Sequence, residues 1–129
     1  MVCPAEARQN SRSSKRTLAK GQFERAEKQR TALQGKPKSE RTVEEYEKLV
    51  SSYRRVYLIT PHAAEVPAAL VAVAELYQEM GRQSDRKYFQ SAIDAYQFLL
   101  HEYPVSRYRE DALMTIGQIQ KDEIGRAHV

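Results

Sequence analysis

A repeat of apolar positions is the feature that most constrains how this chain can fold. Residues 46–61 match residues 89–104 at a constant offset of 43 residues. The matched pairs are Tyr46 and Phe89, Leu49 and Ala92, Val50 and Ile93, Tyr53 and Tyr96, Val56 and Leu99, Tyr57 and Leu100, and Pro61 and Pro104. The segments that follow keep this register, with Ala69, Leu70, Val73 and Ala74 matching Ala112, Leu113, Ile116 and Gly117. Agreement at so many positions predicts structural units that bury their faces by stacking on one another.

The spacing of these apolar residues predicts helices. Within each segment they recur every three or four residues, which places them on one face of a helix. We expect five helices with short loops, over residues 15–34, 43–60, 67–81, about 84–103 and about 107–125. Thr42 and Glu45 have the spacing of a capping box at the start of the second helix. No segment alternates with period two over a useful length, so the fold class is all-α.

The composition changes along the chain and suggests four regions. Residues 1–14 are polar and are expected to be a disordered leader, because they have too little apolar surface to offset the entropy of ordering. Residues 15–41 form an N-terminal helix and linker, residues 42–125 the helical repeats, and residues 126–129 a tail. The first 17 residues have no apolar core typical of a signal peptide. No apolar run is long enough for a membrane-spanning helix.

The charge is concentrated near the N-terminus. The net charge is +4, but residues 1–41 hold 11 basic and 4 acidic side chains, and the remainder is mildly acidic. The chain therefore presents no general basic surface, and a nucleic-acid partner is disfavoured. A basic nucleic-acid-binding module, built on residues 15–41, is kept as an alternative.

The residues that could carry chemistry do not form a recognisable site. His62, His101 and His128 lack the spacing of metal ligands, and the single cysteine, Cys3, has no partner for an internal disulfide. The acidic group at residues 44–47 fits the first turn of a helix, where carboxylates are electrostatically favoured. Six of the eight tyrosines fall on the apolar stripes and are expected in the core. We therefore expect no catalytic site, no metal and no cofactor.

Two neighbouring predicted helices carry a pattern that resembles the tetratricopeptide repeat (TPR). The first has the large, small and aromatic positions of that pattern, at Leu70, Val73, Ala74, Tyr77 and Gly81. The second follows it at Ala92, Tyr96 and Pro104, with Leu99 in place of a small residue. The offset of 43 residues exceeds the family's usual period of about 34. The resemblance implies a right-handed α-solenoid of antiparallel helix pairs, with about two and a half units.

The same resemblance implies where a ligand would bind. In TPR proteins the first helices of successive units line a concave groove. By register these positions are Ala68, Val71, Glu75 and Gln78 in one helix and Asp111, Met114, Gln118 and Lys121 in the other. Mixed polar and apolar groups of this kind suit a peptide or protein segment. The last helix would have no second helix to cover Leu113, Ile116 and Ile119, so self-association through this face is also expected.

The segment AIDAYQFLLHEYPVSRYREDALMTIGQI is most similar to repeats of bacterial envelope proteins, including outer-membrane assembly lipoproteins. This resemblance implies a non-catalytic interaction scaffold in the periplasm or cell envelope, with the cytoplasm as the alternative compartment. The stretches YRRVYLITPHA and AVAELYQEMGRQ are also similar to the N-terminal helical region of bacterial N-acetylmuramoyl-L-alanine amidases. On that alternative the chain is an accessory region, and the catalytic domain lies elsewhere in a longer protein.

Overall fold

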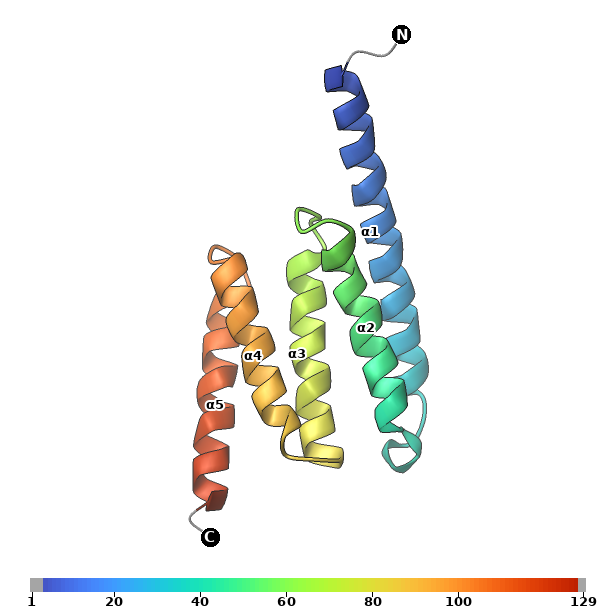
Figure 1. The fold of residues 1–129 in the computed structure, drawn as a ribbon. Coiled ribbons are helices and arrows are strands. Elements are labelled where there is room, and N and C mark those ends of the chain that lie inside the picture. Colours follow the sequence, from blue (N-terminus) through green and yellow to red (C-terminus); the bar gives the residue numbers. More distant parts are fainter. Residues whose placement is uncertain (1–3, 128–129) are drawn as a thin grey trace. The chain divides into compact units, whose positions relative to one another are not determined.

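A computed structural model describes residues 4–127, and the side chains of residues 12–126. The described chain contains five α-helices, one short 3-10 helix and no strand, which confirms the all-α class and the number of helices (Figure 1). The elements are α1 (Pro4–Gln34), η1 (Lys38–Glu40), α2 (Val43–Ile59), α3 (Val66–Gln83), α4 (Tyr88–Glu102) and α5 (Arg109–Ala127). No helix in this range is both long and apolar enough to cross a membrane.

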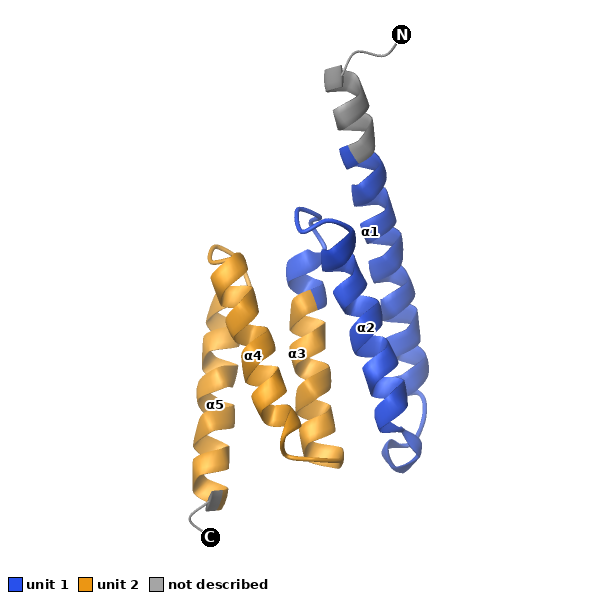
Figure 2. Ribbon diagram, in the orientation of Figure 1, with its two compact units in different colours: residues 1–69 blue, residues 70–129 orange. Residues whose placement is uncertain are grey.

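The chain divides into two compact units, residues 1–69 and residues 70–129 (Figure 2). The first unit contains α1, η1, α2 and the first turn of α3. The second contains the rest of α3 together with α4 and α5.

Helix α1 begins at Pro4, ahead of the expected start at Lys15, so residues 4–14 of the expected leader are helical. Proline suits this position because the first turn of a helix does not need its missing amide. Residues 1–3 lie outside the described residues. The helix ends at Gln34, as the following Gly35 and Pro37 predict.

The buried face of α1 matches only in part the helical spacing of its apolar residues Leu18, Phe23, Ala26 and Leu33. Leu18 is 57% exposed, whereas Ala19, Gln22, Ala26 and Leu33 are buried. The apolar residues of this helix are sparse, so contact with α2 decides which side is covered. Gln22 tolerates burial because its Nε2 donates a hydrogen bond to the Ser52 carbonyl oxygen on α2, at 3.0 Å.

Two further contacts join α1 to α2, and an ion pair joins the loop between them to α2. The Phe23 and Tyr53 rings pack edge to face, with centroids 6.0 Å apart. The Tyr53 hydroxyl donates to Glu27 Oε1 at 3.0 Å. Burial, followed by this bond to a carboxylate, raises the pKa of Tyr53. Near the loop between the helices, Lys36 Nζ lies 2.9 Å from Glu45 Oε2.

The start of α2 confirms the capping box. The Glu45 backbone N–H donates to Thr42 Oγ1, and the Thr42 backbone N–H donates to Glu45 Oε1. Two amides that a helix start leaves without partners are thereby satisfied. The helix ends at Ile59, shortly before Pro61, as expected.

In the second unit, Gly81 does not end α3, which continues to Gln83. The expectation of a helix stop at Gly81 was wrong for a packing reason. A Cβ atom at residue 81 would lie 2.9 Å from three ring carbons of Phe89 on α4. The glycine therefore allows α4 to approach α3 closely, and the helix continues through it.

Helices α4 and α5 begin later than the sequence predicts. Helix α4 begins at Tyr88 and follows a turn in which Asp85 Oδ1 accepts a hydrogen bond from the Lys87 N–H. Helix α5 begins at Arg109 and follows a similar turn, in which Ser106 Oγ accepts from the Tyr108 N–H. In both places a side chain three residues before the helix start accepts a hydrogen bond from the backbone N–H two positions further on. Helix α5 passes Gly125 and ends at Ala127.

Candidate protein-interaction surface

The buried residues of α2 and α4 occupy identical positions of the repeat. Those of α2 are Tyr46, Leu49, Val50, Tyr53 and Val56. Those of α4 are Phe89, Ala92, Ile93, Tyr96 and Leu99. Each residue of the first set lies 43 positions before its counterpart in the second. The offset found in the sequence therefore describes burial as well as residue type.

Equivalent residues of α3 and α5 are buried to a similar degree on one side of the helix and to different degrees on the other. Val73 and Leu76 are buried on α3, and so are their counterparts Ile116 and Ile119 on α5. Leu70, in contrast, is 5% exposed while its counterpart Leu113 is 48% exposed. Ala74 and Gly81 are also buried, and their counterparts Gly117 and Ile124 are exposed. These three positions lie on one stripe of each helix.

On α3 this stripe packs against α4. The Tyr77 and Tyr88 rings are stacked, with centroids 6.3 Å apart and planes 11° apart. The close approach of Phe89 to Gly81 lies one turn further along the same face. Beside this stripe, the Tyr96 hydroxyl donates to Gln78 Oε1 at 2.9 Å. At Tyr77 and Gly81, α4 therefore contacts the side of α3 whose equivalents on α5, Gln120 and Ile124, are exposed.

We call the exposed set on α5 the α5 stripe, made of Leu113, Gly117, Gln120 and Ile124 (α5 is in orange in Figure 2). Its members follow the helical spacing i, i+4, i+7 and i+11 and so form one face. Ile124 is 61% exposed, and nothing lies within 4 Å of a Cβ built on Gly117. The stripe is therefore open along most of the helix.

A hollow of about 400 Å³ adjoins the α5 stripe between α4 and α5. Its lining combines apolar and polar side chains, namely Arg86, Phe89, Gln90, Ile93, Gln120, Glu123 and Ile124. Arg86 Nη2 lies 2.9 Å from Glu123 Oε2 and closes one edge with an ion pair. The hollow thus offers an apolar base with a charged border beside the exposed stripe.

The structure corrects the expected uncovered face of the last helix. Ile116 and Ile119 are buried, with 9% and 5% of their surface exposed, because they lie on the side of α5 that packs against α4. Leu113 alone of the three expected residues is exposed, and Ile124 joins it. The exposed apolar residues of α5 therefore lie on a different face of the helix from the predicted one.

The groove residues expected from the TPR resemblance lie on α3 and α5. Val71 and Gln78 are half-buried, and Glu75, Asp111, Met114, Gln118 and Lys121 are exposed. Ala68, one turn before Val71, is half-buried in the first unit. Gln78 uses its carbonyl oxygen to accept from Tyr96, and Gln118 Nε2 donates to Asp122 on its own helix. All eight positions are accessible to some degree.

No group of three or more His, Cys, Asp or Glu side chains within the described residues could hold a metal ion. His62 and His101 are exposed, and His128 lies outside the described residues. The acidic residues of α2 are held at its first turn, where the carboxylate of Glu45 takes part in the capping box. Glu45 therefore has a structural role at the start of a helix.

Comparison of the chain with protein-family models, with curated proteins and with solved structures finds no match. The description of the surface therefore depends on the residues and on the internal repeat.

The sequence did not single out Gln120 and Ile124 as parts of a binding surface. The signal was nevertheless in the repeat, since residue 124 is the counterpart of Gly81 and residue 120 that of Tyr77. Using that signal requires knowing that α4 covers this side of α3, which comes only from the structure.

Proposed function

We propose that the chain is a non-catalytic interaction scaffold of TPR type that docks an amphipathic helix from a protein partner on the α5 stripe. One observation carries the proposal: Gln120 and Ile124, which are exposed on α5, are the counterparts of Tyr77 and Gly81, which contact α4 on α3. In this interpretation the antiparallel helix pairs form a short right-handed solenoid. A helix with the character of α4 completes the last unit.

The chemistry of the occupant follows from α4. A helix with a large aromatic residue near its start and small and branched residues one and two turns later would repeat the set Phe89, Ala92, Ile93, Tyr96 and Leu99. Nothing lies within 4 Å of a Cβ built on Gly117, so a partner helix can approach α5 closely at this residue. Burial of Leu113 and Ile124 would contribute most of the free energy of association.

A synthetic peptide with the sequence of residues 88–102 is a direct probe of this surface, because it carries the apolar stripe of α4. We expect the full chain to bind this peptide, with a rise in helical circular dichroism, and the L113E/I124E variant to bind it at least about 10-fold more weakly. The matched control is L58E/V105E, which places two charges on exposed apolar residues outside α5 (Leu58 is 74% and Val105 97% exposed). Equal binding by all three chains would refute the α5 stripe as the docking site.

A second copy of the chain is the alternative occupant. It would produce a dimer that L113E/I124E abolishes in sedimentation velocity without any peptide. That result would replace the partner helix with self-association.

The groove implied by the TPR resemblance is proposed as a second contact area for the same partner. Its exposed groups, such as Glu75 and Lys121, could bind the backbone of an extended segment that continues from the docked helix. For the compartment we propose the periplasm or cell envelope, from the resemblance to bacterial envelope repeats. The role of accessory region of a cell-wall amidase is consistent with the same docking surface.

A further inference from the structure

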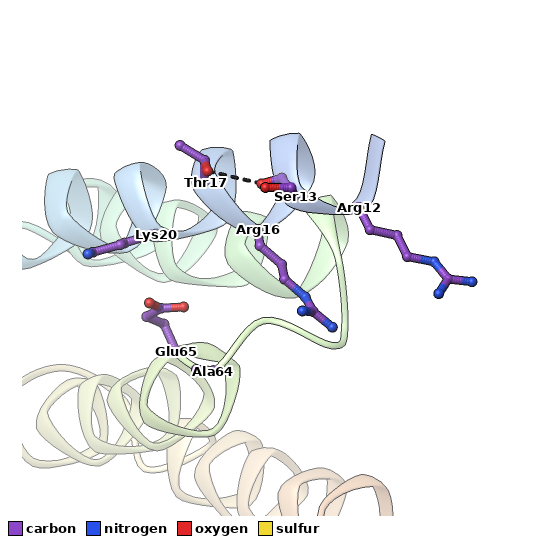
Figure 3. A pocket seen from close by; sticks show the side chains of 7 residues that line it. All are labelled: Arg12, Ser13, Arg16, Thr17, Lys20, Ala64 and Glu65. Carbon is purple, nitrogen blue, oxygen red and sulfur yellow. Dashed lines mark hydrogen bonds between the residues drawn. The ribbon is translucent and has the colours of Figure 1, made fainter. Parts of the chain in front are cut away.

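Basic side chains of α1 gather beside the loop that joins α2 to α3, all within the first unit. Arg12, Arg16 and Lys20 are spaced by four residues, and Lys15 lies next to them on the helix. Figure 3 shows Arg16 directed toward the loop and Glu65 facing α1 from the end of that loop. This arrangement places four cations around one stretch of backbone.

Two hollows open at this place, and Arg12 and Arg16 line both. The first, of about 520 Å³, is lined by Arg12, Lys15, Arg16, Ile59, Thr60, Pro61 and His62. The second, of about 530 Å³, is lined by Arg12, Ser13, Arg16, Thr17, Lys20, Ala64 and Glu65. Glu65 is the single carboxylate among these lining residues. No acidic side chain is among the described residues that line the first hollow.

These cations are not neutralised by neighbouring side chains. Among the side chains of residues 12–126, none of Arg12, Lys15, Arg16 and Lys20 forms a hydrogen bond or an ion pair. Lys36 and Arg86, in contrast, are each paired with a glutamate. Like charges four residues apart on a helix repel each other, so an anion between Arg12 and Arg16 would remove an unfavourable interaction.

The polar groups near these cations can donate hydrogen bonds to the oxygen atoms of an anionic ligand. Thr60 Oγ1 accepts a hydrogen bond from the His62 N–H at 3.4 Å, which leaves its own proton available for donation. The planar guanidinium groups of Arg12 and Arg16 can each donate two parallel hydrogen bonds to the oxygens of a phosphoryl group. Each hollow is large enough for a phosphoryl group with its ester substituent.

We propose that these two hollows form a binding site for a phosphoryl-bearing anion, held by Arg12 and Arg16 with support from Lys15, Lys20 and Thr60. The anion is either a soluble phosphate compound or the headgroup of an acidic phospholipid, which share this chemistry. A nucleic acid is disfavoured because no aromatic side chain is among the described residues that line the two hollows, so none is placed there to stack on a base.

The test is calorimetric titration of the full chain with inorganic pyrophosphate, together with co-sedimentation with vesicles. The vesicles contain either phosphatidic acid in phosphatidylcholine or phosphatidylcholine alone. The variant is R12Q/R16Q, and the matched control is R82Q/R126Q, which removes the same charge from exposed arginines of the second unit. All these side chains are exposed, and circular dichroism melting verifies that each variant remains folded.

We expect R12Q/R16Q to weaken binding by about 10-fold or more, because two charge-assisted contacts are lost, and R82Q/R126Q to leave it nearly unchanged. Binding of pyrophosphate identifies a soluble ligand, and binding of acidic vesicles alone identifies a lipid headgroup. The proposal is overturned if neither probe binds, or if both variants weaken binding equally. It is also overturned if a single-stranded DNA oligonucleotide binds with an affinity that grows with its length.

Discussion

At the scale of single residues, Glu45 links the end of α1 to the start of α2. Its carboxylate accepts hydrogen bonds from Lys36 Nζ at 2.9–3.0 Å and from the Thr42 backbone N–H at 3.1 Å. The bond from Lys36, followed by the bond from Thr42, lowers the pKa of Glu45 below its ordinary value of 4.5. The Glu45 side chain thus takes part both in the capping box with Thr42 and in the ion pair with Lys36.

This lowered pKa makes part of the stability dependent on pH. Because the pKa of Glu45 is lower in the folded than in the unfolded chain, its contribution is present above about pH 4.5 and is lost as the pH falls through the folded value. We predict that Lys36→Met lowers the melting temperature by a few degrees at neutral pH and has a smaller effect at pH values below the folded pKa.

Thermal melting by circular dichroism at neutral and acidic pH measures this difference. Lys38→Met is the matched control, because Lys38 is exposed and forms no ion pair among the side chains of residues 12–126. An equal loss for Lys36→Met at both pH values would show that the Lys36 and Glu45 pair contributes nothing to folding.

At the scale of helices, two glycines in helix interiors have different roles. Gly81 on α3 lies against the Phe89 ring, at 2.9 Å from a Cβ that alanine would add. Gly117 on α5, the counterpart of Ala74, has no atom within 4 Å of a Cβ built on it. Glycine in a helix interior is intrinsically unfavourable, so only a packing requirement justifies keeping it there.

We predict opposite effects for the two alanine substitutions. Gly81→Ala should lower the free energy of unfolding by about 1–3 kcal/mol, because the buried ring must move. Gly117→Ala should raise it by about 0.5–1 kcal/mol, because it gains helix propensity without a clash. Urea unfolding measures both changes. If Gly81→Ala were as stabilising as Gly117→Ala, the close packing of α4 on α3 would be wrong.

Helix starts and ends that depend on neighbouring residues were predictable from the sequence. Features that depend on contact with another helix were not. The capping box at Thr42 and the glycine after α1 act within a few residues, and the structure confirms both. Gly81 has the same local signature as a helix end, and only the position of Phe89 separates the two roles. Apolar spacing identifies Ala26 and Leu33 on the buried face of α1 but not Gln22, because Gln22 is buried through a bond to a distant carbonyl.

At the scale of the whole molecule, the repeat register could be read from the sequence, but the exposed side of the last helix could not. The offset of 43 residues predicts which residues of α2 and α4 are buried, and five matched pairs are buried on both helices, whereas Tyr57 and Leu100 are both half-buried. It also predicts equivalent stripes on α3 and α5. Which stripe is covered depends on whether a further helix lies beside it, and no pattern within α5 contains that information.

The basic side chains of the molecule are concentrated on α1, in the first unit. Basic residues of the first unit include the two like-charged pairs Arg12 with Arg16 and Arg16 with Lys20, each four residues apart on α1. No carboxylate is ion-paired to them within the described side chains. Each such pair destabilises a helix by about 0.2–0.5 kcal/mol at low ionic strength. Added salt screens this repulsion over distances of about 10 Å or less.

We therefore predict that the melting temperature rises when salt is added in the range below physiological ionic strength. The exposed ion pairs, such as Arg86 with Glu123, weaken under the same conditions, but each of them contributes little. R12Q/R16Q should raise the melting temperature in low salt and flatten its salt dependence, whereas R82Q/R126Q should leave the slope nearly unchanged. Melting curves of the three chains in sodium chloride, a salt without a phosphoryl group, separate screening from binding at the proposed anion site. A melting temperature of the unmodified chain that falls with salt would mean that ion pairs dominate, and that the cluster on α1 is not under repulsive strain.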